Sequence, residues 1–149
     1  PTANQCLSTG VNGQLAWGGT ASAGIKTLVG AVNDTQTWTV TQPAGTLLVD
    51  AGLVVTTATV GAATIDVRVG TAAGGAQLAV DADLCSSSVA ALGSAISTSA
   101  KGEGAAFLAF TAGAALYTDV ERTIHIQAKI TTTATSVGAG RAFIKFDVL

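Results

Sequence analysis

Apolar and polar residues alternate along several stretches of the chain, with the period of two that indicates a β-strand with one buried face. The alternation is clearest in residues 35–41, 64–70, 123–131 and 142–149. The positions predicted to face a core in these stretches are Trp38, Val40, Ile65, Val67, Val69, Ile124, Ile126, Ala128, Ile130, Ile144, Phe146 and Val148. Residues 46–58 are apolar at nearly every position, as expected for a strand covered on both faces.

We predict that the strands at 46–58 and 64–70, joined by a turn of small residues at 60–63, organise the rest of the chain. A further turn is predicted at 43–45, where proline suits the first central position. The threonine- and glycine-rich residues 132–140 are expected to close a hairpin between the last two strands.

Shorter strands are expected at 25–32, 105–110 and 115–118. Residues 76–100 are ambiguous, because their first part fits a strand edge or a helical turn and their later apolar positions have the spacing of a short helix. No segment is long enough for a helix that crosses between parallel strands. The pattern therefore predicts an all-β protein built as an antiparallel β-sandwich.

Residues 1–24 are dense in turn formers, and we predict an extended N-terminal arm that precedes a single β-sandwich domain at 25–149. Leu15 and Trp17 form a short apolar cluster in this arm, which favours docking onto the same subunit or a neighbour. A loosely ordered terminus is the alternative. The chain begins at Pro1 without a recognisable signal peptide, which we interpret as loss of an initiator methionine.

Composition narrows the possible partners. Only 11% of the 149 residues are charged, against roughly 25% in an ordinary soluble domain. The surface is therefore either a solvated, threonine-rich β surface or one buried against other subunits. The seven Lys and Arg residues are scattered and the net charge is −2, so we expect no nucleic-acid partner. No apolar run approaches the roughly 18 residues of a spanning helix, so we expect no membrane partner.

Residue types that carry chemistry are sparse. His125 is the only histidine and lies within a predicted strand, so we interpret it as structural. Asp81 with Asp83, and Asp119 with Glu121, lack the spacing of a calcium loop and are expected to be solvated turn carboxylates. We therefore expect no enzymatic activity, no cofactor and no metal.

The two cysteines, Cys6 and Cys85, lie far apart in the sequence. A disulfide framework in a small secreted protein normally uses four or more cysteines, so we expect free thiols rather than a bridge.

Three stretches resemble a known group of proteins: PAG followed by LLVDAGLVVTT, then IDVRVGTAAGGAQLAVDADL, then HIQAKITTTATSVGAGRAFIKFDVL. They are similar to the small jelly-roll-like structural proteins of tailed bacteriophages, many of which are cement or decoration proteins of the head. The resemblance covers about residues 42–149, and the final strand, ending at Leu149, departs from the pattern of that group.

The resemblance implies a jelly-roll-like sandwich and a structural virion protein on the outer capsid surface. Such a protein binds between subunits of the major capsid protein and forms a homo-oligomer, with a trimer favoured over a dimer. We assign Leu15, Trp17 and Trp38 as candidate oligomer or capsid contacts. One alternative function is a receptor- or glycan-binding domain of a phage tail fibre or head fibre, and another is a subunit of an extracellular, pilus-like polymer.

Overall fold

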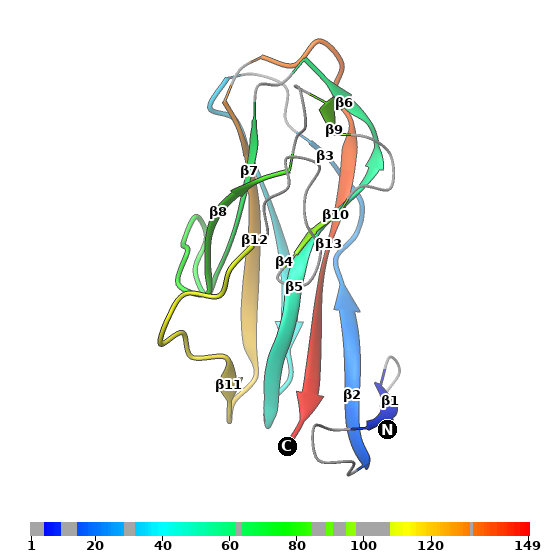
Figure 1. Cartoon of the computed structure of the whole chain (residues 1–149), viewed down its shortest axis with the longest axis vertical. Coiled ribbons are helices and arrows are strands. Elements are labelled where there is room, and N and C mark those ends of the chain that lie inside the picture. Colours follow the sequence, from blue (N-terminus) through cyan, green and yellow to red (C-terminus); the bar gives the residue numbers. More distant parts are fainter. Residues whose placement is uncertain are drawn as a thin grey trace.

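The computed structural model describes residues 5–9, 15–28, 32–61, 64–84, 89–90, 95–97, 108–131 and 133–149. Every regular element in these ranges is a β-strand (Figure 1). The strands are β1 (Gln5–Thr9), β2 (Leu15–Ser22), β3 (Lys26–Thr27), β4 (Thr35–Gln42), β5 (Thr46–Thr57), β6 (Thr59–Val60), β7 (Ile65–Gly70), β8 (Ala79–Asp83), β9 (Val89–Ala90), β10 (Ala95–Ser97), β11 (Tyr117–Thr118), β12 (Arg122–Ile130) and β13 (Ala139–Val148).

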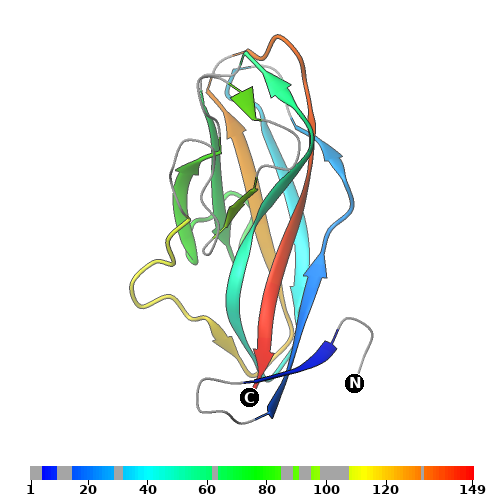
Figure 2. The same cartoon turned by 45° about the vertical axis from the view of Figure 1, so that its right-hand side comes forward.

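Two antiparallel sheets form the body of the molecule. Sheet A has the order β1-β2-β13-β5-β10, with β3 paired to β13 and β11 paired to β5. Sheet B has the order β4-β12-β7-β8. Figure 2 shows β5 and β13 side by side along the length of sheet A. The predicted all-β, antiparallel sandwich is confirmed.

The strand order is that of a jelly roll. We number the strands that build the two layers from one to eight in chain order: β2, β4, β5, β7, β8, β10, β12 and β13. Sheet A then reads 1-8-3-6 and sheet B reads 2-7-4-5. First pairs with eighth, second with seventh, third with sixth and fourth with fifth, as in a long hairpin rolled into two layers. The jelly-roll-like class is therefore confirmed.

The inner faces of the two sheets enclose one hydrophobic core. On β12 the buried residues are Ile124, Ile126, Ala128 and Ile130, and on β13 Ala142, Ile144 and Phe146. The alternation read from the sequence thus identifies the core face correctly on both strands. The opposite face of each strand is half-buried or exposed, as period-two geometry requires.

The predicted hairpin between the last two strands is wrong, and the two strands joined by the predicted turn at 60–63 do not pair with each other. β5 and β7, which are separated in the chain by the two-residue strand β6, lie in opposite sheets, and so do the consecutive strands β12 and β13. Each connection is an arch that crosses from one layer to the other, and neither is a hairpin. The pattern could not distinguish these cases, because two consecutive strands with buried faces can pair edge to edge or stack face to face.

The described part of the N-terminal segment, β1 and β2, belongs to sheet A rather than to an arm outside the sheets. β2 pairs with β13 from Phe143 opposite Ser22 to Asp147 opposite Gly18. The expected boundary at residue 24 therefore falls just after a strand that belongs to the sandwich. The main-chain hydrogen bonds of β13 require a neighbour on both sides, and β2 supplies one of them.

Residues 76–100 contain strands where they are described, at β8, β9 and β10, so the short helix considered for this region is wrong. The predicted strand at 105–110 lies mostly outside the described residues, and its final residue forms an isolated bridge between Phe110 and Ala79. Cys85 also lies outside the described residues. Whether the two thiols are free stays a prediction.

Candidate interaction surface

A shallow groove of about 610 Å³ crosses the outer face of sheet A. Its lining residues are Thr20, Ser22, Ile25, Val54, Thr56, Arg141, Phe143 and Lys145. They come from β2, β5 and β13 and from the residues just after β2. Because the even-numbered residues Ala142, Ile144 and Phe146 are buried in the core, the odd-numbered residues of β13 point outward into the groove.

The groove combines an apolar centre with positive charge. Phe143 lies between Arg141 and Lys145 along β13, and the Lys145 Nζ is 5.9 Å from the centre of the Phe143 ring. The same Nζ is 3.7 Å from Oδ2 of Asp50, which is almost fully buried, while the Lys145 side chain is 53% exposed. Arg141 makes no ion pair with the part of the chain that the structure describes. The groove therefore carries positive charge that the described residues only partly balance.

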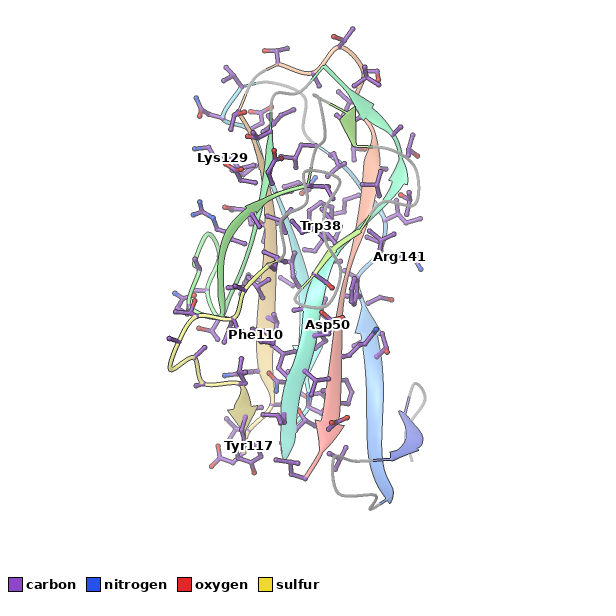
Figure 3. All side chains as sticks on the ribbon, in the orientation of Figure 1. Trp38, Asp50, Phe110, Tyr117, Lys129 and Arg141 are labelled. Carbon is purple, nitrogen blue, oxygen red and sulfur yellow. The ribbon has the colours of Figure 1, made fainter. Side chains whose placement is uncertain are left out.

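A second surface lies at the lower end of the sandwich, where β5 and β12 begin and β13 ends (Figure 1). Exposed apolar side chains gather there: Tyr117 is 48% exposed, Val120 63% and Leu149 77%. Asp119 and Glu121 flank Val120 and are also exposed. We call residues 117–121 the tip, and Figure 3 shows Tyr117 at this end.

Hydrogen bonds anchor both sides of the tip to the sheets. Gln42 is fully buried, and its Nε2 donates to the carbonyls of Thr46 at 3.1 Å and Leu116 at 3.0 Å. The Arg122 Nε donates to Oε1 of Gln42 at 2.9 Å, and its Nη2 donates to the carbonyl of Ala115 at 2.6 Å. Burial lowers the pKa of the Arg122 guanidinium below its ordinary value. The tip, which begins with the short strand β11 paired to β5, is thus held at both ends.

Sequence reasoning missed the pair Gln42 and Arg122, although a signal was present. Gln42 continues the inward-facing positions Trp38 and Val40, and Arg122 continues the inward-facing series that begins at Ile124. A polar residue at an inward position of an amphipathic strand predicts a buried hydrogen-bonding site, because buried polar groups need partners.

The structure places the three residues assigned as candidate contacts in different surroundings. Leu15 and Trp17 lie at the start of β2, which is at the same end of the molecule as the tip, since Gly18 pairs with Asp147 near the end of β13. The side chains of both residues lie outside the described part. Trp38 is wrong as a contact: it is 0% exposed and lies between the two sheets, because its position on β4 faces inward (Figure 3).

The remaining candidate groups have structural neighbours. His125 lies in the middle of β12, opposite Thr39 of β4 and Gly70 of β7. Oδ1 of Asp83 accepts a 3.0 Å hydrogen bond from the backbone N–H of Ile65. Among the described residues, no three His, Cys, Asp or Glu side chains come together as metal ligands. The described strands and loops also contain no helix suited to crossing a membrane.

The strand order assigns the fold, and unrelated functions occur on jelly rolls, so function has to be argued from the groove and the tip. Comparison of the chain with protein-family models, with curated proteins and with solved structures finds no match.

Proposed function

We propose that this protein is a structural virion subunit that binds the outer surface of a bacteriophage head, between major capsid protein subunits, and stabilises the head as a homo-oligomer. The observation that carries the proposal is the exposed apolar surface at both ends of a compact jelly roll. Jelly rolls form many viral capsid subunits. Apolar side chains that cluster on an exposed surface commonly mark a site where another molecule binds.

The upper end, where β12 ends and β13 begins, is the surface that we assign to the capsid. Val60 and Val137 are exposed there, and Val60 pairs with Ser136 next to Val137. The connecting residues 58–64 and 131–138 contain no charged side chain. An uncharged, apolar surface loses little hydration free energy when a partner covers it, which suits contact with a shell.

The proposed mechanism of stabilisation is mass action. A subunit that binds only the assembled shell shifts the equilibrium towards that shell. In a homo-oligomer each weak contact is repeated by symmetry, so the avidity exceeds the affinity of one contact. A trimer or a dimer would both act in this way, with the trimer favoured by the resemblance described above.

Binding to heads tests this function. Heads of the encoding virus that lack this protein are mixed with the purified chain and sedimented, and the bound protein and the thermal resistance of the heads are measured. We expect saturable binding and increased resistance for the natural chain, and reduced occupancy for the double variant Val60→Asp with Val137→Asp. Thr39→Asp with Thr41→Asp, both exposed on β4 and away from the upper end, is the matched control. Failure of the natural chain to bind heads would overturn the proposal.

A glycan-binding role is the second candidate, and Phe143 favours it. This aromatic ring lies in the groove beside the hydroxyl groups of Thr20 and Ser22, and aromatic faces with nearby hydroxyls suit sugars. Binding of the protein to host envelope polysaccharide, lost in Phe143→Ala and independent of heads, would favour this candidate over the capsid role.

A further inference from the structure

We propose that the tip of one copy of this chain seats in the groove on sheet A of another copy, with Val120 over Phe143 and the flanking carboxylates beside Arg141 and Lys145. The inference rests on the self-association included in the proposed function, and it does not depend on binding to heads. It identifies the two surfaces that meet and predicts that the contact joins unlike faces.

The groove contributes an apolar floor between two cations. Residues two apart on one face of a strand are about 6.7 Å apart, so Arg141, Phe143 and Lys145 form a row with the aromatic ring at its centre. Arg141 has no ion pair among the described residues, and within the same ranges Lys145 is balanced only by the buried Asp50 at 3.7 Å. A partner with an apolar side chain between two negative charges could cover Phe143 and neutralise the charges of Arg141 and Lys145.

The tip offers the reverse pattern. Val120 is 63% exposed and lies between Asp119 and Glu121, and neither carboxylate forms an ion pair with the described residues. The row in the groove reads positive, apolar, positive, and the tip reads negative, apolar, negative. Charge complementarity of this kind gives an interface its orientation and its specificity, and burial of the apolar pair supplies binding free energy.

The contact has to form between two copies. The groove lies on the outer face of sheet A, and Figure 3 shows Arg141 and Tyr117 on opposite sides of the molecule and at different heights. The hydrogen bonds of Arg122 and Gln42 hold the tip at the lower end. The tip therefore cannot reach the groove of its own chain.

The groove and the tip are different surfaces, so every copy carries one groove and one tip. A copy that has used its tip in one contact can still use its groove in another. A reciprocal dimer or a closed ring pairs every tip with a groove, whereas an open arrangement leaves one of each free. A closed assembly of few copies also fits the homo-oligomer of the proposed function.

Self-association of the full chain in the absence of heads tests the inference. The dissociation constant is measured by sedimentation equilibrium for the natural chain, for a groove variant (Arg141→Glu) and for a tip variant (Asp119→Lys with Glu121→Lys). We expect each variant to associate at least about tenfold more weakly, because like charges then face each other. Lys129→Glu, which makes the same charge change as the groove variant on the outer face of sheet B, should associate as the natural chain does.

Mixing the two weakened variants is the decisive step. In an equimolar mixture, the acidic tip of the groove variant can enter the unchanged groove of the tip variant. The lysine-bearing tip of the tip variant can likewise enter the groove that Arg141→Glu has made more acidic. We therefore expect the mixture to recover association that neither variant has alone. Circular dichroism of each variant establishes that a weakened copy is still folded.

Three results would overturn the inference: a natural chain that stays monomeric at about 100 μM, variants that associate as tightly as the natural chain, or a mixture that stays as weak as its components. The first result, combined with binding of a glycan to the groove, would assign the groove to that ligand. Failure of head binding with intact self-association would instead count against the proposed function alone.

Discussion

Gln42 and Arg122 lie opposite each other at the ends of β4 and β12, and the Arg122 Nε donates a 2.9 Å hydrogen bond to Oε1 of Gln42. The guanidinium also donates to the carbonyls of Ala115 and Leu116, so it joins sheet B to the segment that leads into the tip. The group stays protonated at neutral pH even though burial lowers its pKa. These hydrogen bonds offset the cost of removing a charged group from water.

Removal of the Arg122 side chain should therefore destabilise the fold. Arg122→Ala leaves Oε1 of the buried Gln42 without its charged donor, and a hydrogen bond to a charged group contributes about 1.5–3 kcal/mol. For a domain of this size we expect the melting temperature to fall by about 4–10 °C in thermal unfolding followed by circular dichroism. Arg141→Ala, which removes an exposed arginine, should change it by about 2 °C or less. Equal melting temperatures for the two variants would refute the role of Arg122.

The pair should also show coupling in a double-mutant cycle. Gln42→Leu alone leaves Arg122 short of an acceptor, and Arg122→Leu alone leaves Gln42 short of a donor. Replacing both by leucine removes both unsatisfied groups, so the double variant should be more stable than the sum of the single effects by about 0.5–3 kcal/mol. Urea unfolding of the four proteins measures this difference. Strict additivity would indicate that the two side chains act only through packing.

Replacement of Gly52 by any larger residue should destabilise the fold for a steric reason. A Cβ at this position would lie 2.2 Å from the carbonyl oxygen of Ile96 and 2.4 Å from the Cβ of Ser97, so β10 would have to move away from β5. We expect Gly52→Ala to cost about 1–3 kcal/mol in urea unfolding and to increase amide hydrogen exchange at Ile96. Gly24→Ala, where a Cβ would meet no atom within 4 Å, is the matched control and should leave stability unchanged or slightly raised.

Val49 should be dispensable in a way that its neighbours on β5 are not. Lys145 pairs with Asp50 and Phe146 pairs with Leu48, so Val49 is the extra residue of a β-bulge. Deleting Val49 converts the bulge into a regular pair and keeps inward residues inward. We therefore expect this deletion variant to remain folded, with native-like dispersion in its amide NMR spectrum.

Deletion of Val54 is the contrasting variant for the bulge. This residue lies in regular pairing with Arg141, so its loss moves the buried Val55 to an outward position and Thr56, the extra residue at the second register shift of β5, to an inward one. Exposing the Val55 side chain and burying a threonine hydroxyl should destabilise this variant by about 2–3 kcal/mol more than the deletion of Val49, as measured by urea unfolding. If the two deletions had equal effects, the bulge would not set the register.

Part of the groove can be predicted from local sequence. The outward positions of β13 follow from its alternation, so that pattern is enough to place Arg141, Phe143 and Lys145 on one face. The strands β2 and β5, which complete the groove beside them, cannot be placed in this way. β2 contains few alternating apolar residues, and its place beside β13 depends on long-range hydrogen bonds that leave no local pattern.

The tip, too, is only partly predictable from local sequence. The acidic residues around Val120 are visible in the sequence, but their exposure depends on the anchoring of Ala115, Leu116 and Arg122 to Gln42 across the sheets. Contacts between residues far apart in the chain decide which turn projects and which turn is covered. Trp38 illustrates the reverse error: its alternation predicts an inward position, which is correct, and its assignment as a contact is wrong because it fills the space between the layers.

The sequence by itself determined the secondary structure class, the faces of the alternating strands and the low-charge character of the surface. These properties are local: they follow from side-chain period and composition, which each strand carries without its neighbours. Only the tertiary structure decided which strands pair, that consecutive strands arch between sheets, and that the groove and the tip lie apart on one molecule. Those outcomes depend on pairing across long stretches of chain, where many arrangements bury the same apolar faces and only one also satisfies the main-chain hydrogen bonds.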